Sequence, residues 1–126
     1  MKYHFIASKS NEAQKAKNKF VKRYENVKPN KADFIIPIGG DGFLLKSLHD
    51  FCDLNKPFFG INCGSIGFLM NSINYKNLES VIQMSKKTNF APLEMKAINK
   101  NGKEYKSIAY NEVSLMRQTH LASKIN

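Results

Sequence analysis

The sequence predicts an α/β fold, from an alternating pattern in its first 90 residues and a change of pattern after them. Short apolar segments at 3–7, 33–38 and 58–62 alternate with segments whose apolar residues recur at helical spacing. That alternation is typical of a parallel sheet with crossover helices. We therefore expect a three-layer parallel-sheet domain over residues 1–90, followed over 91–126 by the beginning of an all-β domain.

A strand and a helix are expected first, over residues 3–7 and 11–26. Apolar residues at helical spacing indicate the helix, namely Ala13, Ala16, Phe20, Val21 and Tyr24. Pro29 and Asn30 should end it, because proline lacks the N–H that a helix interior needs and both residues favour turns.

The second strand, over residues 33–38, leads directly into residues 39–42, the first glycine turn. A helix over 43–52 should follow, with a buried side formed by Leu44, Leu48, Phe51 and Cys52. Pro37 conflicts with a central strand, because it has no N–H to donate. We expect it where only its carbonyl is needed, or beside a bulge.

A third strand, over residues 58–62, runs into residues 60–69, the second glycine segment. Six of the seven glycines lie between Gly39 and Gly67, within or beside these two stretches. Both stretches should emerge at the carboxyl edge of the sheet, where ligands bind in such folds. Phe68 is then either a core residue or an aromatic face against which a purine ring packs.

The pattern changes after a helix expected over residues 76–87. Segments 90–98 and 105–115 flank Asn101 and Gly102, which together are a strong hairpin signal. Two adjacent antiparallel strands at this point indicate the start of an all-β domain. We therefore expect the chain to be the N-terminal portion of a longer protein.

Composition limits the classes of partner. The net charge of +10 includes five loosely grouped basic residues on the helix expected at 11–26, without the aromatic ladder or zinc-ligand spacing of dedicated nucleic-acid modules. A general attraction for anionic nucleotides explains this positive charge, and we expect no specific nucleic-acid partner. Cys52 and Cys63 form no CxxC pair, and no apolar run reaches eighteen residues. A cytoplasmic protein with free thiols and no membrane partner is expected.

Asp41 stands among the glycines of the first glycine turn and can be interpreted in more than one way. As a structural residue it would be a helix N-cap, worth about 1 kcal/mol. A P-loop is excluded because Leu45 precedes Lys46, and no GxGxxG fingerprint is present. The remaining interpretation is that the Asp41 carboxylate, exposed on a turn of glycines without side chains, orients a hydroxyl group. It would then take the proton of that hydroxyl as a phosphate arrives.

These residues together resemble the NAD kinase family. The first glycine turn resembles its glycine-aspartate motif, residues 60–69 resemble its second glycine segment, and Asn111 with Glu112 is similar to its asparagine-glutamate pair. Order and spacing agree, and the resemblance covers residues 33–124. The resemblance implies an enzyme that phosphorylates the adenosine ribose 2′-hydroxyl of NAD to give NADP, with ATP or, in some members, polyphosphate as donor.

The resemblance also implies roles for individual residues. Asp41 would be the general base and Gly42 would lie against the substrate. Phe68 would lie near the adenine, and Asn111 with Glu112 would hold ribose hydroxyls. An amide beside a carboxylate can form hydrogen bonds with both the donors and the acceptors of a ribose.

Mg²⁺ is expected on the phosphates of ATP, because it prefers oxygen ligands supplied largely by nucleotide and water. No metal ligand is assigned among the protein side chains. The family's second domain is much longer than residues 91–126, so we expect homo-oligomerisation through the missing part and little activity from this chain alone. Phe43 replaces the small polar residue of many members. The alternatives are a lipid kinase of the diacylglycerol type and a non-catalytic nucleotide-binding module.

Overall fold

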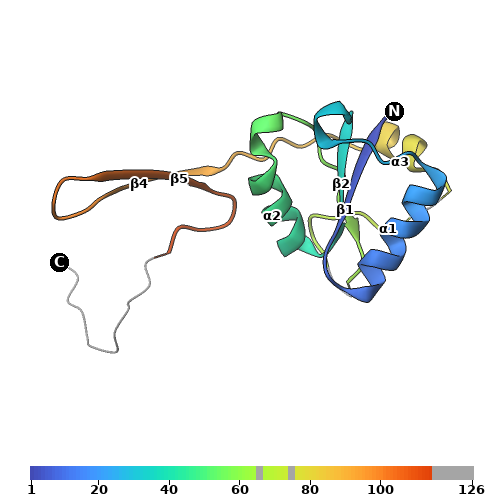
Figure 1. The fold of residues 1–126 in the computed structure, drawn as a ribbon, viewed down its shortest axis with the longest axis horizontal. Helices are drawn as coiled ribbons and strands as arrows, with labels where there is room; N and C mark the ends of the chain where they lie inside the picture. The colour runs from blue at the N-terminus through green and yellow to red at the C-terminus, as the bar shows by residue number, and fades with distance from the viewer. Residues whose placement is uncertain (65–66, 74–75, 115–126) are drawn as a thin grey trace. The chain divides into compact units, whose positions relative to one another are not determined.

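The computed structural model describes residues 1–64, 67–73 and 76–114. The chain divides into two compact units, Met1–Phe90 and Ala91–Asn126. The first unit combines helices with a parallel sheet, and the described part of the second is a β-hairpin (Figure 1).

The sheet of the first unit has three parallel strands in the order β1, β2, β3. These strands span Tyr3–Ala7, Phe34–Gly39 and Ile61–Asn62. The α/β class with a parallel sheet is therefore confirmed, and the first strand has the expected bounds. The third strand is shorter than expected, because Phe58 makes only an isolated bridge to Ile35.

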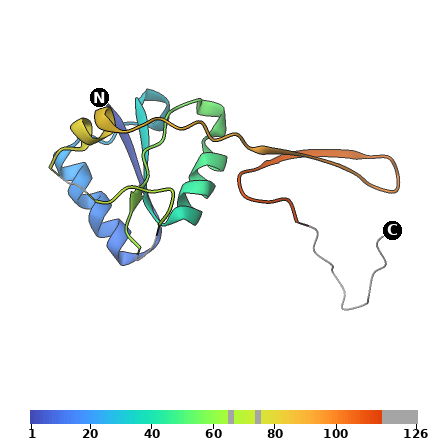
Figure 2. The same ribbon diagram turned by 180° about the vertical axis from the view of Figure 1, so that it is seen from behind.

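Helices cover both sides of this sheet. Helices α1 (Asn11–Arg23) and α3 (Leu78–Met84) lie on one side, and α2 (Asp41–Asp50) lies on the other (Figures 1 and 2). Short 3₁₀ helices, η1 (Pro29–Lys31) and η2 (Cys52–Leu54), follow α1 and α2.

The main core lies between the sheet and α1. Phe5 and Phe20 are fully buried, and their rings stack with centroids 5.5 Å apart. Ile36 and Ile38 of β2 join this cluster. Ile35 alternates to the other face and is equally buried. Each such side chain contributes about 1.5–3 kcal/mol by burial, so these few residues fix β2 between its two covering layers.

Helix α1 begins as expected and ends three residues early. The Ser10 hydroxyl accepts a hydrogen bond from the Ala13 N–H and caps the first turn. Tyr24 leaves the helix in an extended conformation, because the next residues pair with the free edge of β1. The Asn26 side chain accepts from the Phe5 N–H at 2.9 Å, and the Val27 N–H donates to the Tyr3 carbonyl. Residues that the sequence pattern assigned to the helix therefore pair with the edge strand β1.

Pro37 does lie in the central strand, where the pairing between β2 and β3 is interrupted. The Ile35 N–H donates to the Pro57 carbonyl and its carbonyl accepts from the Phe59 N–H. Regular pairing resumes at Ile38 and Gly39. Pro37 lies between these two pairings. Because it has no N–H to donate, it interrupts the ladder of hydrogen bonds between β2 and β3.

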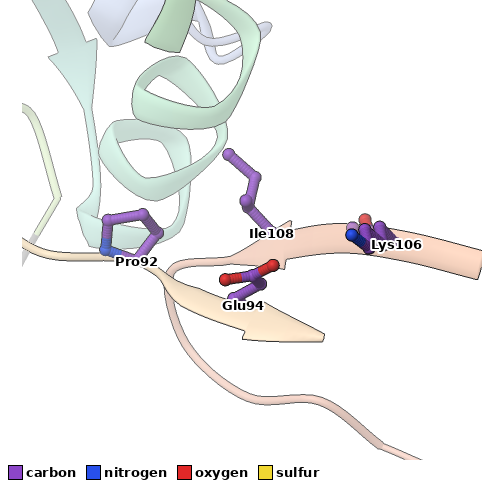
Figure 3. A pocket seen from close by; sticks show the side chains of 5 residues that line it. Pro92, Glu94, Lys106 and Ile108 are labelled. Carbon is purple, nitrogen blue, oxygen red and sulfur yellow. The ribbon is translucent and has the colours of Figure 1, made fainter. Parts of the chain in front are cut away.

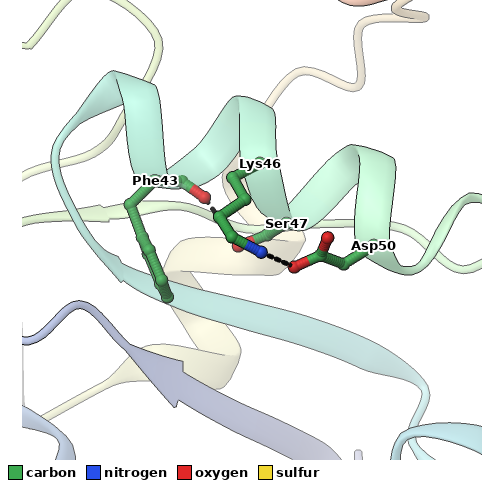
Figure 4. A network of polar contacts seen from close by, with 4 residues as sticks. All are labelled: Phe43, Lys46, Ser47 and Asp50. Carbon is green, nitrogen blue, oxygen red and sulfur yellow. Dashed lines mark hydrogen bonds and ion pairs between the residues drawn. The ribbon is translucent and has the colours of Figure 1, made fainter. Parts of the chain in front are cut away.

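Helix α2 has a narrower buried side than expected. Leu44 and Ser47 are buried, whereas Leu48, Phe51 and Cys52 are only partly buried. The Ser47 hydroxyl is satisfied because it donates to the Phe43 carbonyl at 2.7 Å (Figure 4).

The solvent side of α2 carries an ion pair between Lys46 and Asp50, one helical turn apart (Figure 4). Across the described part of the chain, every helix falls short of the length and apolar character that spanning a membrane requires.

The second unit contains the expected hairpin, formed by β4 (Leu93–Ile98) and β5 (Glu104–Ala109). The Gly102 N–H donates to the Asn99 carbonyl, and Gly102 has φ of 77°. Asn101 has no positive φ, so the turn is not the two-residue type I′ form that an Asn-Gly pair suggests. The pattern fits a type I turn followed by a glycine bulge.

Candidate functional site

Asp41 is the first residue of α2, and only Gly40 separates it from the carboxyl end of β2. The N-cap interpretation of this residue is wrong, because Gly40 occupies the N-cap position. The Asp41 side chain instead reaches the second glycine segment. Its Oδ2 accepts from the Phe68 N–H at 2.8 Å, and its Oδ1 accepts from the Leu69 N–H at 3.3 Å.

These two hydrogen bonds fix the direction of the Asp41 carboxylate and leave some of its lone pairs free. An ionised carboxylate has about four lone-pair sites, and two backbone donors use two of them. Hydrogen bonds of an ionised group are stronger than neutral ones, so the two contacts orient the side chain firmly. The positive end of the α2 dipole also favours a negative charge in this first turn. Asp41 is only partly buried and can therefore meet a ligand.

Both glycine stretches emerge at the same edge of the sheet, as the parallel topology requires. Gly39 pairs in register with Asn62, and the Cys63 N–H donates to the Gly39 carbonyl at 2.9 Å. Burial raises the pKa of the Cys63 thiol, and the negative charge of Glu12 raises it further. Cys63 is therefore a protonated packing residue at this edge and a poor nucleophile.

Gly67 lies close to side chains from both glycine stretches. A Cβ atom built there would lie 2.9 Å from Nδ2 of Asn62 and 3.3 Å from Oδ1 of Asp41. A side chain at this position would force Asn62 or Asp41 to move. Gly42 differs, because a Cβ built there meets nothing within 4 Å. The backbone at Gly42 is consequently accessible to a ligand.

Phe68 is 90% exposed, so its interpretation as a core residue is wrong. The hydrogen bond from its backbone to Asp41 places an exposed aromatic residue beside the acid. Its assignment as a face for adenine stays a prediction.

Asn111 and Glu112 belong to the second unit and follow the end of β5. Both are exposed there. The structure thus brings Asp41 and Phe68 together in the first unit, and the role of the asparagine-glutamate pair stays a prediction. A pocket of about 570 Å³ on the hairpin contains none of the predicted site residues (Figure 3). It is lined by Pro92, Glu94, Lys106, Ser107 and Ile108.

Asn62 was given no role from the sequence, yet its side chain joins two parts of the second glycine segment. Its Oδ1 accepts from the Gly64 N–H at 2.8 Å. An asparagine two residues before a glycine is a turn signal, because its side chain bonds the backbone two residues on. That local signal could have identified the turn, whereas the contact of Asn62 with Gly67 depends on the fold.

Residues 2–90 match the family described as the ATP-NAD kinase N-terminal domain. A protein of Rhizobium meliloti named NAD kinase is 43% identical over 121 residues, which are 96% of this chain and 47% of the relative. A NAD kinase of Xylella fastidiosa is 41% identical over 97% of this chain and 47% of its own length.

A NAD kinase of Rickettsia canadensis is 46% identical over 103 residues, or 82% of this chain and 40% of the relative. The chain spans about half the length of the curated relatives it matches.

Proposed function

The chain belongs to the NAD kinase family, and on that premise we propose that the full-length protein transfers a phosphoryl group from ATP, or polyphosphate, to the adenosine ribose 2′-hydroxyl of NAD. The product is NADP. The lipid-kinase alternative is not favoured, since the relatives described above are named NAD kinase.

One observation carries the chemical part of the proposal. Two backbone N–H groups hold the Asp41 carboxylate at the sheet edge where both glycine stretches emerge. In the proposed step the 2′-hydroxyl oxygen bonds to the terminal phosphorus of the donor, and the bridging P–O bond to ADP breaks. The hydroxyl proton passes to a free lone pair of Asp41, which acts as general base.

The other site residues are proposed to bind and orient NAD. Gly42 leaves space for the substrate against the first turn of α2, and the exposed Phe68 ring offers its face to adenine. Asn111 and Glu112 would hold ribose hydroxyls. In this proposal residues 1–90 form the α/β domain with the base, and residues 91–126 begin a β-rich domain.

A divalent cation such as Mg²⁺ is proposed to arrive on the phosphates of ATP. The described residues contain no group of three or more His, Cys, Asp or Glu side chains arranged to hold a metal ion. Mg²⁺ commonly keeps several waters and takes the rest of its ligands from one or two carboxylates and from substrate phosphates. We further propose a cytoplasmic homo-oligomer whose partners are nucleotides rather than a membrane or nucleic acid.

The test is Asp41→Asn in the full-length protein, with Asp50→Asn as the matched control. Both changes remove one carboxylate from α2, but Asp50 lies at its far end in an exposed pair with Lys46. We expect Asp41→Asn to lower kcat for NADP formation by about 10²–10⁴-fold, the usual contribution of a general base. The control should keep its kcat, because exposed ion pairs contribute little.

Calorimetric titration of both variants with NAD separates loss of the base from loss of the binding site. An Asp41→Asn protein that binds NAD and turns over as fast as wild type would end the proposal.

A further inference from the structure

Asn62 is the last residue of β3 and pairs in register with Gly39, two residues before Asp41. Its backbone N–H donates to the Asn71 carbonyl at 2.8 Å. The backbone of Asn62 is therefore held on both sides, by β2 and by the segment at Asn71. A side chain that starts from such a fixed point can hold others in place.

The Asn62 side chain contacts two parts of the second glycine segment. Its Oδ1 accepts from the Gly64 N–H at 2.8 Å. Its Nδ2 and Cγ lie 2.9 and 3.1 Å from the point where Gly67 would carry a Cβ. One amide thus ties down the start of the turn and packs against its last glycine.

Asp41 contacts the same glycine. The Cβ point at Gly67 lies 3.3 Å from Asp41 Oδ1 and 2.9 Å from Asn62 Nδ2, so these two atoms are separated by no more than the sum of those distances. The two residues after Gly67 then donate their N–H groups to Asp41. The position of Gly67 therefore sets where those two donors point.

We propose that Asn62 is a positioning residue, which holds Gly67 so that the Phe68 and Leu69 amides orient the Asp41 carboxylate. This inference rests on the proposed role of Asp41 as base. Without the Asn62 amide, Gly67 loses its packing partner and Gly64 loses its acceptor. The carboxylate is then no longer held in one direction, and small misplacements of a reacting group cost large factors in rate.

The first experiment compares Asn62→Ala with Asn71→Ala in the full-length protein. Asn71 is the matched control, because its side chain donates to a Gly60 carbonyl that already accepts the Asn71 backbone N–H. We expect Asn62→Ala to lower kcat by about 10- to 100-fold and the control to keep its kcat. Equal effects of the two substitutions, or no effect of the first, would overturn the inference.

Amide hydrogen exchange gives a readout that does not depend on activity. Asn62→Ala should accelerate exchange at the Phe68 and Leu69 amides, and Asn71→Ala should leave it unchanged. Retained protection in Asn62→Ala overturns the positioning role even in a protein without kinase activity. Conversely, if Asp41→Asn keeps full turnover while exchange responds as expected, the proposed function fails and the positioning role stands.

Asn62→Asp adds a readout that a merely structural residue would not move. This substitution keeps an acceptor for the Gly64 N–H and places a second carboxylate near Asp41. Because a neighbouring like charge disfavours ionisation, the acid limb of the kcat/KM profile should move to higher pH. An acid limb at the wild-type pH would contradict the closeness of the two side chains on which the inference depends.

Discussion

The backbone nitrogen of Phe68 lies 2.8 Å from Oδ2 of Asp41 and donates its hydrogen to that oxygen. This bond joins residues that are 27 positions apart in the chain. It holds the acid of the first glycine turn and the exposed ring of the second glycine segment at one place. This contact fixes the carboxylate and the backbone that carries the ring relative to each other, as the roles proposed for these two residues require.

Gly67→Ala should destabilise the first unit and impair the site. The added methyl would lie 2.9 Å from Asn62 Nδ2 and 3.3 Å from Asp41 Oδ1, so at least one of these side chains must move. Overpacking of this kind costs about 1–3 kcal/mol. Urea unfolding should show a lower midpoint, and kcat should fall because the donors to Asp41 are displaced.

Gly42→Ala is the control for that substitution and should act in the opposite sense on stability. A methyl at Gly42 meets no atom within 4 Å, and the residue lies in the first turn of α2. Replacing a helical glycine by alanine stabilises by about 0.4–1 kcal/mol where the conformation allows it. The Kd for NAD should nevertheless rise, because the methyl occupies space assigned to the substrate. Unchanged NAD affinity would remove Gly42 from the proposed site.

Phe68→Ala should weaken NAD binding without destabilising the protein. The ring is 90% exposed, so its removal leaves no cavity, and the midpoint of urea unfolding should stay within the range of surface substitutions. Stacking of a base on an aromatic ring is worth about 1–3 kcal/mol, so the Kd for NAD should rise by about 5- to 150-fold. Phe68→Tyr keeps the aromatic face and should bind NAD nearly as wild type does. Equal affinity of the alanine variant would exclude stacking on this ring.

Sequence patterns predicted the framework of the fold well and its contacts less well. The bounds of β1 follow from a short apolar run, and the strand leading to the first glycine turn follows from an apolar run that ends at glycine. Helix α1 ends early because Asn26 bonds the Phe5 backbone, a contact between residues far apart in the chain. The spacing of apolar residues within α1 does not indicate where the following residues pair with the edge of the sheet.

The candidate site shows the same division between local and long-range information. Asp41 could be identified because a carboxylate among glycines is a local feature of the sequence. Its partners could not, since the Phe68 and Leu69 donors reach it only through the pairing of Gly39 with Asn62. The exposure of Phe68 likewise depends on how the second glycine segment leaves the sheet, and a single aromatic residue in a glycine-rich stretch carries no signal for it.

Cys63 should react slowly with alkylating reagents. Burial and the nearby Glu12 raise the pKa of this thiol, so its thiolate fraction at pH 8 lies below that of an ordinary cysteine. In a Cys52→Ser protein, modification by iodoacetamide at pH 8 should be several-fold slower than that of glutathione. The rate should keep rising above pH 9. A rate equal to that of glutathione would contradict the burial of the thiol.

Tyr3→Phe should stabilise the first unit, and the gain should grow at high pH. Tyr3 is 3% exposed, and its hydroxyl has no hydrogen-bond partner among the described residues. Burial, helped by the charge of Glu79, raises the pKa of Tyr3 to about 12. The unfolded chain loses this proton near pH 10 and the folded protein near pH 12, so wild type loses stability between those values. The loss attributable to this hydroxyl reaches about 2–3 kcal/mol.

Tyr24→Phe is the control, because the Tyr24 ring packs edge-on against Tyr3 but its hydroxyl accepts from the Leu78 N–H at the start of α3. Removing that acceptor leaves a backbone donor without its partner and should cost about 1 kcal/mol, with the opposite sign to Tyr3→Phe. Urea unfolding of the three proteins at pH 7 and at several values between 9 and 11 measures both effects. If Tyr3→Phe is destabilised at pH 7, or its advantage stays constant as the pH rises above 10, the buried hydroxyl must have a partner and the explanation fails.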